Sequence, residues 1–246
     1  MKQLLILALY LAMHVTAFGQ TRVEAFIMPG FGYHHMSLNN GDQSVRDSLN
    51  DMDRVRQNWG GGVKFLFYLD KFSALQVGLH YKGLSFTRVK EDLQFHDTVH
   101  PEIGRIIDLS QTIAQKDAYF YHRYRYLSIP VVYQKTFTRQ SFNNKMQFFF
   151  SSGLDFDFLI NDKTSVALPG FSVKGEDRFT INNDYSSSSF NIGLNLGARF
   201  EYRLDEHSNF SVQPAFSYPL LSTAKDELVQ FRLFQFGMAV GVNYLL

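Results

Sequence analysis

The sequence predicts an all-β protein, an eight-stranded antiparallel up-and-down transmembrane β-barrel. Three observations predict it: segments in which apolar and polar residues alternate, an export signal at the N-terminus, and an alternation of long and short connections. The residue alternation has a period of two, which is the period of a β-strand with two different faces. Strands of this kind, repeated along an exported chain, are typical of outer-membrane barrels.

The first residues have the pattern of a secretory signal peptide. Lys2 supplies positive charge, the stretch 4–13 is apolar, and Ala17-Phe18-Gly19 forms a small-x-small cleavage site. The apolar run is too short to span a membrane as a helix. We therefore expect residues 1–19 to be a signal peptide and 20–246 to be the outer-membrane barrel domain. A buried N-terminal helix is the alternative interpretation.

The composition narrows the class further. The chain has no Cys, so we expect neither disulfides nor a lipoprotein anchor, and the net charge of +1 is spread along the chain without a basic patch for nucleic acid. With 25 Phe and 13 Tyr, the chain has the aromatic content that suits a lipid-facing surface. No long apolar run follows the signal, which excludes spanning helices.

The strands themselves are read from the alternation. In 190–204, the clearest case, even positions are apolar and odd positions are polar, charged or glycine. The eight expected strands begin near residues 22, 58, 72, 119, 145, 190, 210 and 234.

Two strands depart from the simple pattern. In the strand from residue 72, Leu84 and Phe86 stand where polar residues are expected, and a β-bulge at Gly83 is the predicted cause. In the strand from residue 119, Pro130 has no N–H and is expected to disturb the hydrogen-bond ladder.

The connections alternate in length. Long extracellular loops and short periplasmic turns are the usual asymmetry of outer-membrane barrels, so an even strand count predicts that both termini are periplasmic. The long connections are 37–57, 88–118 and 161–187, and the short ones are 70–71, 139–144 and 205–209.

The main structural rival is a soluble barrel or sandwich, such as a lipocalin-like carrier, which turns its apolar face inward. Glycines on the polar face argue against it, because they lose stability in water but make room inside a narrow barrel. These glycines are Gly78, Gly153, Gly193, Gly197, Gly237 and Gly241. We therefore expect the apolar face to point to lipid.

The polar face then places charges in the interior. The predicted interior charges are Glu24, Lys64, Lys82, Asp155, Asp157, Arg199, Glu201 and Arg203. Acids and bases are equal in number, which favours a plug of ion pairs over an open pore, and a proton or ion path is the alternative. Because 145–160 and 190–204 are expected neighbours, Asp155 and Asp157 are expected near the inward residues Arg199, Glu201 and Arg203, with the individual pairings left open because the sequence does not give the register.

Two segments resemble a known family. Tyr126-Leu127-Ser128-Ile129-Pro130 is similar to the YLxIP strand of the outer membrane β-barrel domain family that includes PorT-like proteins, with an OmpA/OmpX-type eight-stranded plan. The end of the chain, 241–246, is similar to the signal read by the barrel assembly machinery, although it ends in Leu246 rather than Phe. The resemblance implies fold, location and this assembly partner. Within that family, PorT itself is tied to protein secretion.

The long second loop carries one helical pattern. After Pro101, apolar residues follow near helical spacing and form a loop-interaction candidate, either packing over the barrel mouth or binding a partner protein. They are Ile103, Ile106, Ile107 and Ile113. In the same loop His96 and His100 form a weak metal-site candidate, for which solvated loop histidines are the simpler interpretation.

The predicted function is that of a non-enzymatic integral outer-membrane barrel with a filled interior, no cofactor and no metal, and a structural or interaction role in its loops. The expected partners are outer-membrane lipid, the assembly machinery and a loop-bound protein. A narrow porin or small-solute transporter and a secretion-associated PorT-like barrel are the alternatives. A membrane enzyme is less favoured, because no G-x-S-x-G nucleophile motif occurs.

Overall fold

The computed structural model describes residues 21–38, 51–93, 116–136, 145–167, 178–181, 187–223 and 229–246. The ring strands are β1 (Thr21–Leu38), β2 (Asp53–Tyr68), β3 (Ser73–Leu93), β4 (Lys116–Thr136), β5 (Met146–Ala167), β7 (Phe190–Arg203), β8 (Ser208–Pro219) and β9 (Val229–Leu245). A short strand, β6 (Arg178–Ile181), pairs only with the end of β5. Within these ranges no helix is long and apolar enough to cross a membrane.

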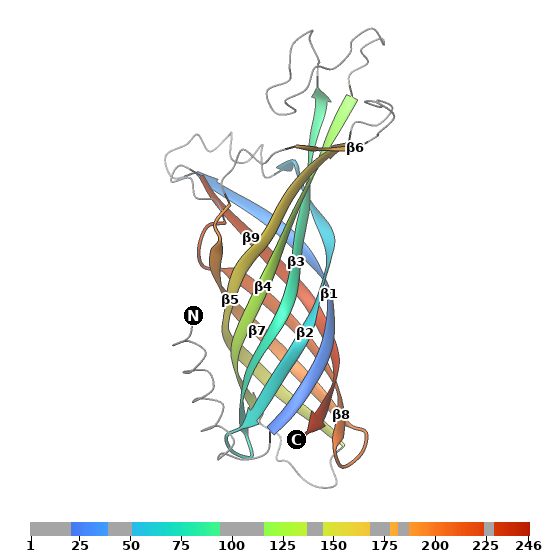
Figure 1. Cartoon of the computed structure of the whole chain (residues 1–246), viewed down its shortest axis with the longest axis vertical. Coiled ribbons are helices and arrows are strands. Elements are labelled where there is room, and N and C mark those ends of the chain that lie inside the picture. The colour runs from blue at the N-terminus through green and yellow to red at the C-terminus, as the bar shows by residue number, and fades with distance from the viewer. Residues whose placement is uncertain are drawn as a thin grey trace.

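The eight ring strands form a closed antiparallel barrel. Each pairs with its neighbours in chain order, and β1 pairs with β9 so that the sheet has no open edge. Figure 1 shows the tilted strands, with the short turns, the start of β1 and the C-terminus at the bottom and β6 near the top. We call these the turn end and the β6 end. The predicted fold class is confirmed.

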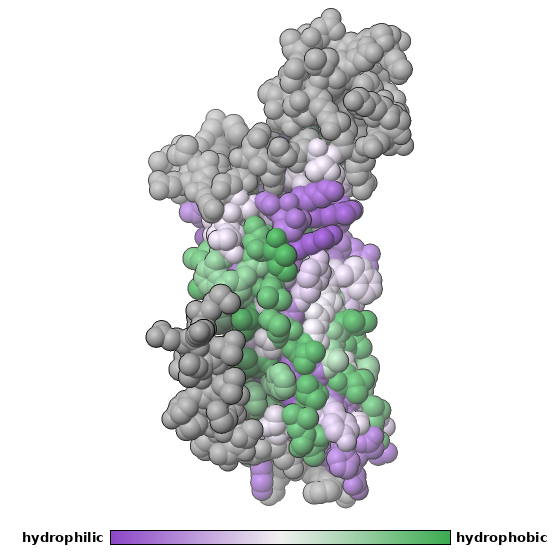
Figure 2. Space-filling model, viewed as in Figure 1, coloured by the Kyte–Doolittle hydropathy of each residue, from purple (hydrophilic) through white to green (hydrophobic). Residues whose placement is uncertain are grey.

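The apolar side chains point outward. Ile27 is 58% exposed, Leu79 50% and Phe236 54%, whereas the interior charges Glu24 and Arg199 are 1% and 0% exposed. Figure 2 shows hydrophobic surface over the middle of the barrel on the face toward the viewer, and we call this zone of outward apolar residues the apolar belt. This arrangement is the inverse of a soluble carrier, and it needs lipid around it to bury the belt.

The expected bulge at Gly83 is wrong. Gly83 pairs with Arg125 of β4 in a register that is uninterrupted on that side, and Lys82, Leu84 and Phe86 are all buried on the same inward face of β3. The chemistry of the interior changes from charged to apolar at this height, while the phase of the strand does not. One bulge lies on the neighbouring strand opposite this stretch, between Val55 and Gly60 on β2, and another is the extra residue Ile160 on β5.

Three prolines inside strands each interrupt one ladder and leave the other intact. Pro130 pairs with Asp155 of β5, but the β3–β4 register passes from Val77↔Val131 to His80↔Ser128 without it. Pro29 interrupts the β1–β9 ladder and Pro214 the β7–β8 ladder in the same way. The disturbance expected at Pro130 is therefore confined to one side, because only the missing N–H is lost.

Two turns at the turn end share one construction. In both, an Asp that is the second residue after the strand accepts hydrogen bonds from the residues that follow, as in an Asx turn. Asp70 accepts from the N–H of Phe72 at 2.5 Å and from the hydroxyl of Ser73 at 2.7 Å. Asp205 accepts from the N–H groups of His207 and Ser208 at 2.8 and 2.7 Å.

These turns also share a sequence, Leu-Asp-x-x-Ser, at 69–73 and 204–208. In each, the leucine N–H donates to the serine carbonyl at 3.0 Å.

The predicted signal peptide, the helical pattern at 103–113 and the loop histidines His96 and His100 lie outside the described residues.

Candidate functional site

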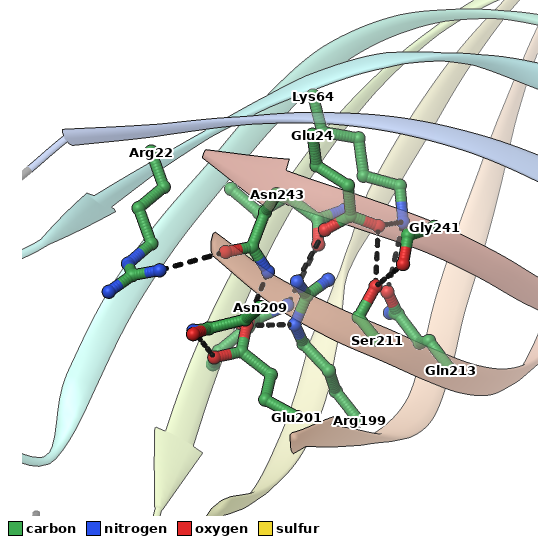
Figure 3. Close-up of polar contacts among 12 residues, drawn as sticks. Arg22, Glu24, Lys64, Arg199, Glu201, Asn209, Ser211, Gln213, Gly241 and Asn243 are labelled. Carbon is green, nitrogen blue, oxygen red and sulfur yellow. Dashed lines mark hydrogen bonds and ion pairs between the residues drawn. The ribbon is translucent and has the colours of Figure 1, made fainter. Parts of the chain in front are cut away.

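The barrel interior holds charged and polar side chains near the turn end. Five of them, contributed by three strands, form what we call the lower ion cluster: Arg22, Glu24, Lys64, Arg199 and Glu201 (Figure 3). Their strands alternate polar and apolar residues, so these side chains turn inward while their neighbours face lipid.

Glu24 of β1 and Arg199 of β7 are the centre of the lower ion cluster. The guanidinium of Arg199 forms an ion pair with Glu24 and donates to Glu201 at 2.7 Å. Glu24 also lies 3.5 Å from the ammonium of Lys64 and accepts from the hydroxyl of Ser211 at 3.1 Å. Charges buried to this degree are stable only when they are paired, and Glu24 and Arg199 each have two oppositely charged partners.

Amide side chains complete the lower ion cluster. Asn243 accepts from Arg22 at 3.0 Å and donates to Glu201 at 3.3 Å, so it links a cation to an anion (Figure 3). Asn209 donates to Glu201 at 3.2 Å, and Gln213 accepts from Lys64 at 3.0 Å.

A second group of buried charges lies nearer the β6 end than the lower ion cluster. We call it the middle ion cluster, and it consists of Lys82, Asp155 and Asp157. The ammonium of Lys82 lies 2.9 Å from Asp157 and 3.6 Å from Asp155. Asn195 donates to both oxygens of Asp155 at 3.1 Å, and Ser217 donates to it at 3.2 Å. One ammonium thus neutralises one of the two carboxylate charges, and neutral donors support the second carboxylate.

An apolar layer follows above the middle ion cluster. Leu84, Phe86, Tyr126 and Leu233 are buried together, with Tyr124 and Leu159 packed against them. These residues place apolar side chains in the barrel interior, next to buried polar residues such as Ser85 and Gln235.

The upper polar cluster lies beyond that layer and consists of His34, Asp53, Arg88 and His122. The carboxylate of Asp53 lies 2.6 Å from Nδ1 of His34 and accepts two hydrogen bonds from Arg88 at 2.9 and 3.1 Å. Phe86 stacks between the rings of His34 and His122, at centroid distances of 4.3 and 4.5 Å. Among the described residues, no three His, Cys, Asp or Glu side chains form a metal site.

The structure brings together most of the predicted interior charges, but with different partners. Asp155 and Asp157 lie opposite Gly193 and Asn191, and Arg199 lies opposite Phe149. The expected proximity of both aspartates to Arg199, Glu201 and Arg203 is therefore wrong, because the register sets them several residues apart along β7. They pair instead with Lys82, which comes from β3.

Two placements differ from the sequence-based set. Arg203 is half-buried at the end of β7, whereas Arg22 is 8% exposed and joins the lower ion cluster. Arg22 faces inward by the same alternation as Glu24, so the signal was present in the first strand. No sequence pattern indicated the pair of His34 on β1 and Asp53 on β2. The two side chains meet only through the pairing of these strands, in the part of β2 that precedes its bulge.

Solved structures that the chain matches include several outer-membrane proteins. The N-terminal β-barrel domain of OprF from Pseudomonas aeruginosa is 12% identical, with 93% of this chain and 98% of that chain covered and a TM-score of 0.42. OprG from Pseudomonas aeruginosa is 8% identical, with 93% and 97% covered and a TM-score of 0.42.

The outer membrane protease OmpT from Escherichia coli is 10% identical, with 92% and 97% covered and a TM-score of 0.42. Likeness at this level says nothing about a shared activity. No curated protein matches the sequence.

The family comparison is more direct. The family model described as "Outer membrane protein beta-barrel domain" matches residues 18–225. That range covers most of the 246 residues and seven of the eight ring strands. The chain belongs to the outer membrane protein β-barrel domain family, and it is an outer-membrane protein.

Proposed function

We propose that the protein is a closed, non-enzymatic anchor in the outer membrane, whose role is carried by the structure that projects beyond the apolar belt. The observation that carries the proposal is the filled interior. Two ion clusters and the apolar layer follow one another along the barrel axis. Eight-stranded barrels have an interior just wide enough for side chains to fill it, so little room for solute is left.

The strands supply the projecting structure. A transmembrane strand needs about 9–11 residues. β3 and β4 have 21 residues each and β5 has 22. Figure 1 shows β3 and β4 rising well beyond the rim of the ring. The two-stranded ribbon of β3 and β4 is longer than membrane insertion requires. The extra length supports an interaction role at the β6 end.

The orientation is part of the proposal. Short turns are usual on the periplasmic side, so the two Leu-Asp-x-x-Ser turns and both termini would be periplasmic, and the β6 end extracellular. Export by a signal peptide at 1–19 and insertion by the barrel assembly machinery belong to the same proposal.

Bilayer conductance tests the closed interior. Purified protein inserted into planar bilayers should show no conductance steps, with a large porin as positive control in the same membrane. A narrow porin or solute transporter, the main alternative, would instead give regular steps or solute flux in liposomes. Such steps would overturn the proposal.

Cysteine labelling tests the orientation, because the chain has no Cys and every introduced one is unique. Glu91 lies near the β6 end of β3 and Lys71 in a turn, and both are exposed. On intact cells an impermeant maleimide should label Glu91→Cys and not Lys71→Cys, whereas both should react in lysed cells. The reverse pattern would contradict the orientation.

Loop replacement tests the interaction role. Replacing 94–115, which includes Ile103, Ile106, Ile107 and Ile113, with a short Gly/Ser linker should leave a heat-modifiable barrel, because every ring pairing lies outside this segment. Loop length itself changes stability only slowly. The variant should lose partner binding or the cellular phenotype of the intact protein. Full function in the folded variant would place the role elsewhere.

A further inference from the structure

Three cations cluster on the outside of the barrel, directly above the apolar belt. Arg123 and Arg125 of β4 and Lys163 of β5 are exposed, and the β4–β5 register sets Arg123 opposite Lys163. We call them the outer cationic cluster. Figure 2 shows strongly hydrophilic surface at this height, over the upper parts of the strands that face the viewer.

A bulge turns Lys163 to the outside. Before Ile160, the odd-numbered residues of β5, such as Asp155 and Asp157, face the interior. The β4–β5 register shifts by one residue at Ile160, and beyond it Thr164 is buried while Lys163 is exposed. Bulges commonly re-aim a side chain in this way. Without it, Lys163 would point inward and Arg123 would have no cationic neighbour across the strand pair.

The outer cationic cluster has no counter-charge in the described chain. Like charges directly opposite each other on antiparallel strands destabilise the pair. No hydrogen bond or ion pair joins Arg123, Arg125 or Lys163 to any residue that the structure describes. The nearby Asp162 accepts a hydrogen bond from Ser187 at 2.6 Å instead. The arrangement therefore costs stability in the isolated chain, and an external anion would remove that cost.

The position of the cluster identifies the anion. On β4 the outward face changes from Leu127, 39% exposed, to Arg125, and on β5 it changes from Ile160, 58% exposed, to Lys163. The cations thus sit where the hydrocarbon ends and lipid headgroups begin. Guanidinium groups suit phosphate oxygens, which they bind through paired N–H donors.

We infer that the outer cationic cluster binds the phosphate groups of lipid A, the multiply phosphorylated glycolipid of the outer leaflet. Three cations within one cross-strand group exceed the single charge of a phosphodiester headgroup, and phosphate monoesters match them better. The choice of leaflet rests on the proposed orientation, with the β6 end extracellular. The chemistry of the site rests only on the cluster itself.

Two charge-matched triple variants test the inference. One removes the cluster, R123Q/R125Q/K163Q. The other, K71Q/K135Q/K145Q, removes three cations at the turn end and changes the net charge equally. Native mass spectrometry and titration with fluorescent lipid A would be done in zwitterionic micelles, with phosphatidylglycerol as the second probe. The cluster variant should bind lipid A roughly a hundredfold more weakly. Each cation contributes about 1 kcal/mol near a phosphorylated surface, and about 1.4 kcal/mol corresponds to a tenfold change in affinity.

The wild type and the turn-end variant should bind alike, and added salt should weaken binding of both. Equal loss in the two variants would show attraction by net charge alone and overturn the inference. So would equal affinity for phosphatidylglycerol and lipid A. Micelle binding does not depend on orientation, so a reversed labelling pattern in cells would reject the proposed orientation without affecting this result.

Stability without lipid gives an independent readout. Lys163→Gln removes the like-charge pair with Arg123, so the variant should be at least as resistant to urea as the wild type in neutral micelles. Lipid A should protect the wild type more than the variant. A variant that is less stable in the absence of lipid would mean that Lys163 has a partner within the chain.

Discussion

Lys82 of β3 donates to Asp157 of β5 at 2.9 Å across the barrel interior, and its ammonium lies 3.6 Å from Asp155 on the same strand. All three side chains are buried. One cation thus serves two carboxylates, supported by Asn195 and Ser217. The middle ion cluster depends on that single ammonium.

Lys82→Met should therefore destabilise the barrel by about 3–5 kcal/mol, the cost of leaving a buried charge without its partner. Adding Asp157→Asn should recover part of the loss, because one uncompensated carboxylate is removed. The free energy of unfolding can be followed in urea by emission of the single Trp, Trp59. Lys71→Met, in an exposed turn, is the control. Equal effects of the two lysine substitutions would contradict the pairing.

Arg199→Ala should cost about 3 kcal/mol, because Glu24 and Glu201 would both lose their guanidinium partner. Arg203→Ala provides a comparison on the same face of β7. Arg203 is only half-buried, so its loss should cost about 1 kcal/mol or less. Heat-modifiable gel mobility and urea unfolding would measure both. The prediction fails if the two substitutions cost the same.

Gly241→Ala should disturb the lower ion cluster. A Cβ at Gly241 would lie 2.7 Å from the carbonyl oxygen of Ala25 and 2.9 Å from the carboxylate of Glu24. The carbonyl belongs to the paired strand and has little room to move. At Gly193 the nearest atom is the rotatable hydroxyl of Ser217, at 3.1 Å. Gly193→Ala should therefore be the milder change in urea unfolding, and the opposite order would contradict the packing described here.

Ser73→Ala should raise the pKa of Asp70 and leave that of Asp205 unchanged. The hydroxyl of Ser73 and the N–H of Phe72 hold the pKa of Asp70 below its usual value, whereas Asp205 is held mainly by the N–H groups of His207 and Ser208. Carbon-detected NMR titration of the two carboxyl groups measures this.

Because both folded-state pKa values are depressed, each aspartate contributes stability above its unfolded pKa. That contribution is lost as the pH falls through the folded value. In the wild type, acidification should therefore loosen both turns, and in Ser73→Ala the turn at Asp70 should loosen at the higher pH. Identical titration of Asp70 in the wild type and the variant would show that the serine hydroxyl has no part in the turn.

The sequence alone was enough to predict the barrel, its strand number and its inward and outward faces. Period-two alternation is a local property, and a one-residue slip would expose every charge in 190–204 to lipid. Residues such as Glu24 and Arg199 could therefore be assigned to the interior without knowing any partner. Their outward neighbours could be assigned to lipid by the same argument.

Only the tertiary structure decided which charges meet. Partners across the interior come from strands far apart in the sequence, as Lys82 and Asp157 do, and their heights depend on the register and tilt of every strand between them. The bulge at Ile160 shows the limit most clearly: one extra residue turns Lys163 outward beside Arg123. Alternation alone would have placed Lys163 inside. The position of a bulge depends on how two strands pair, and the sequence of one strand does not show it.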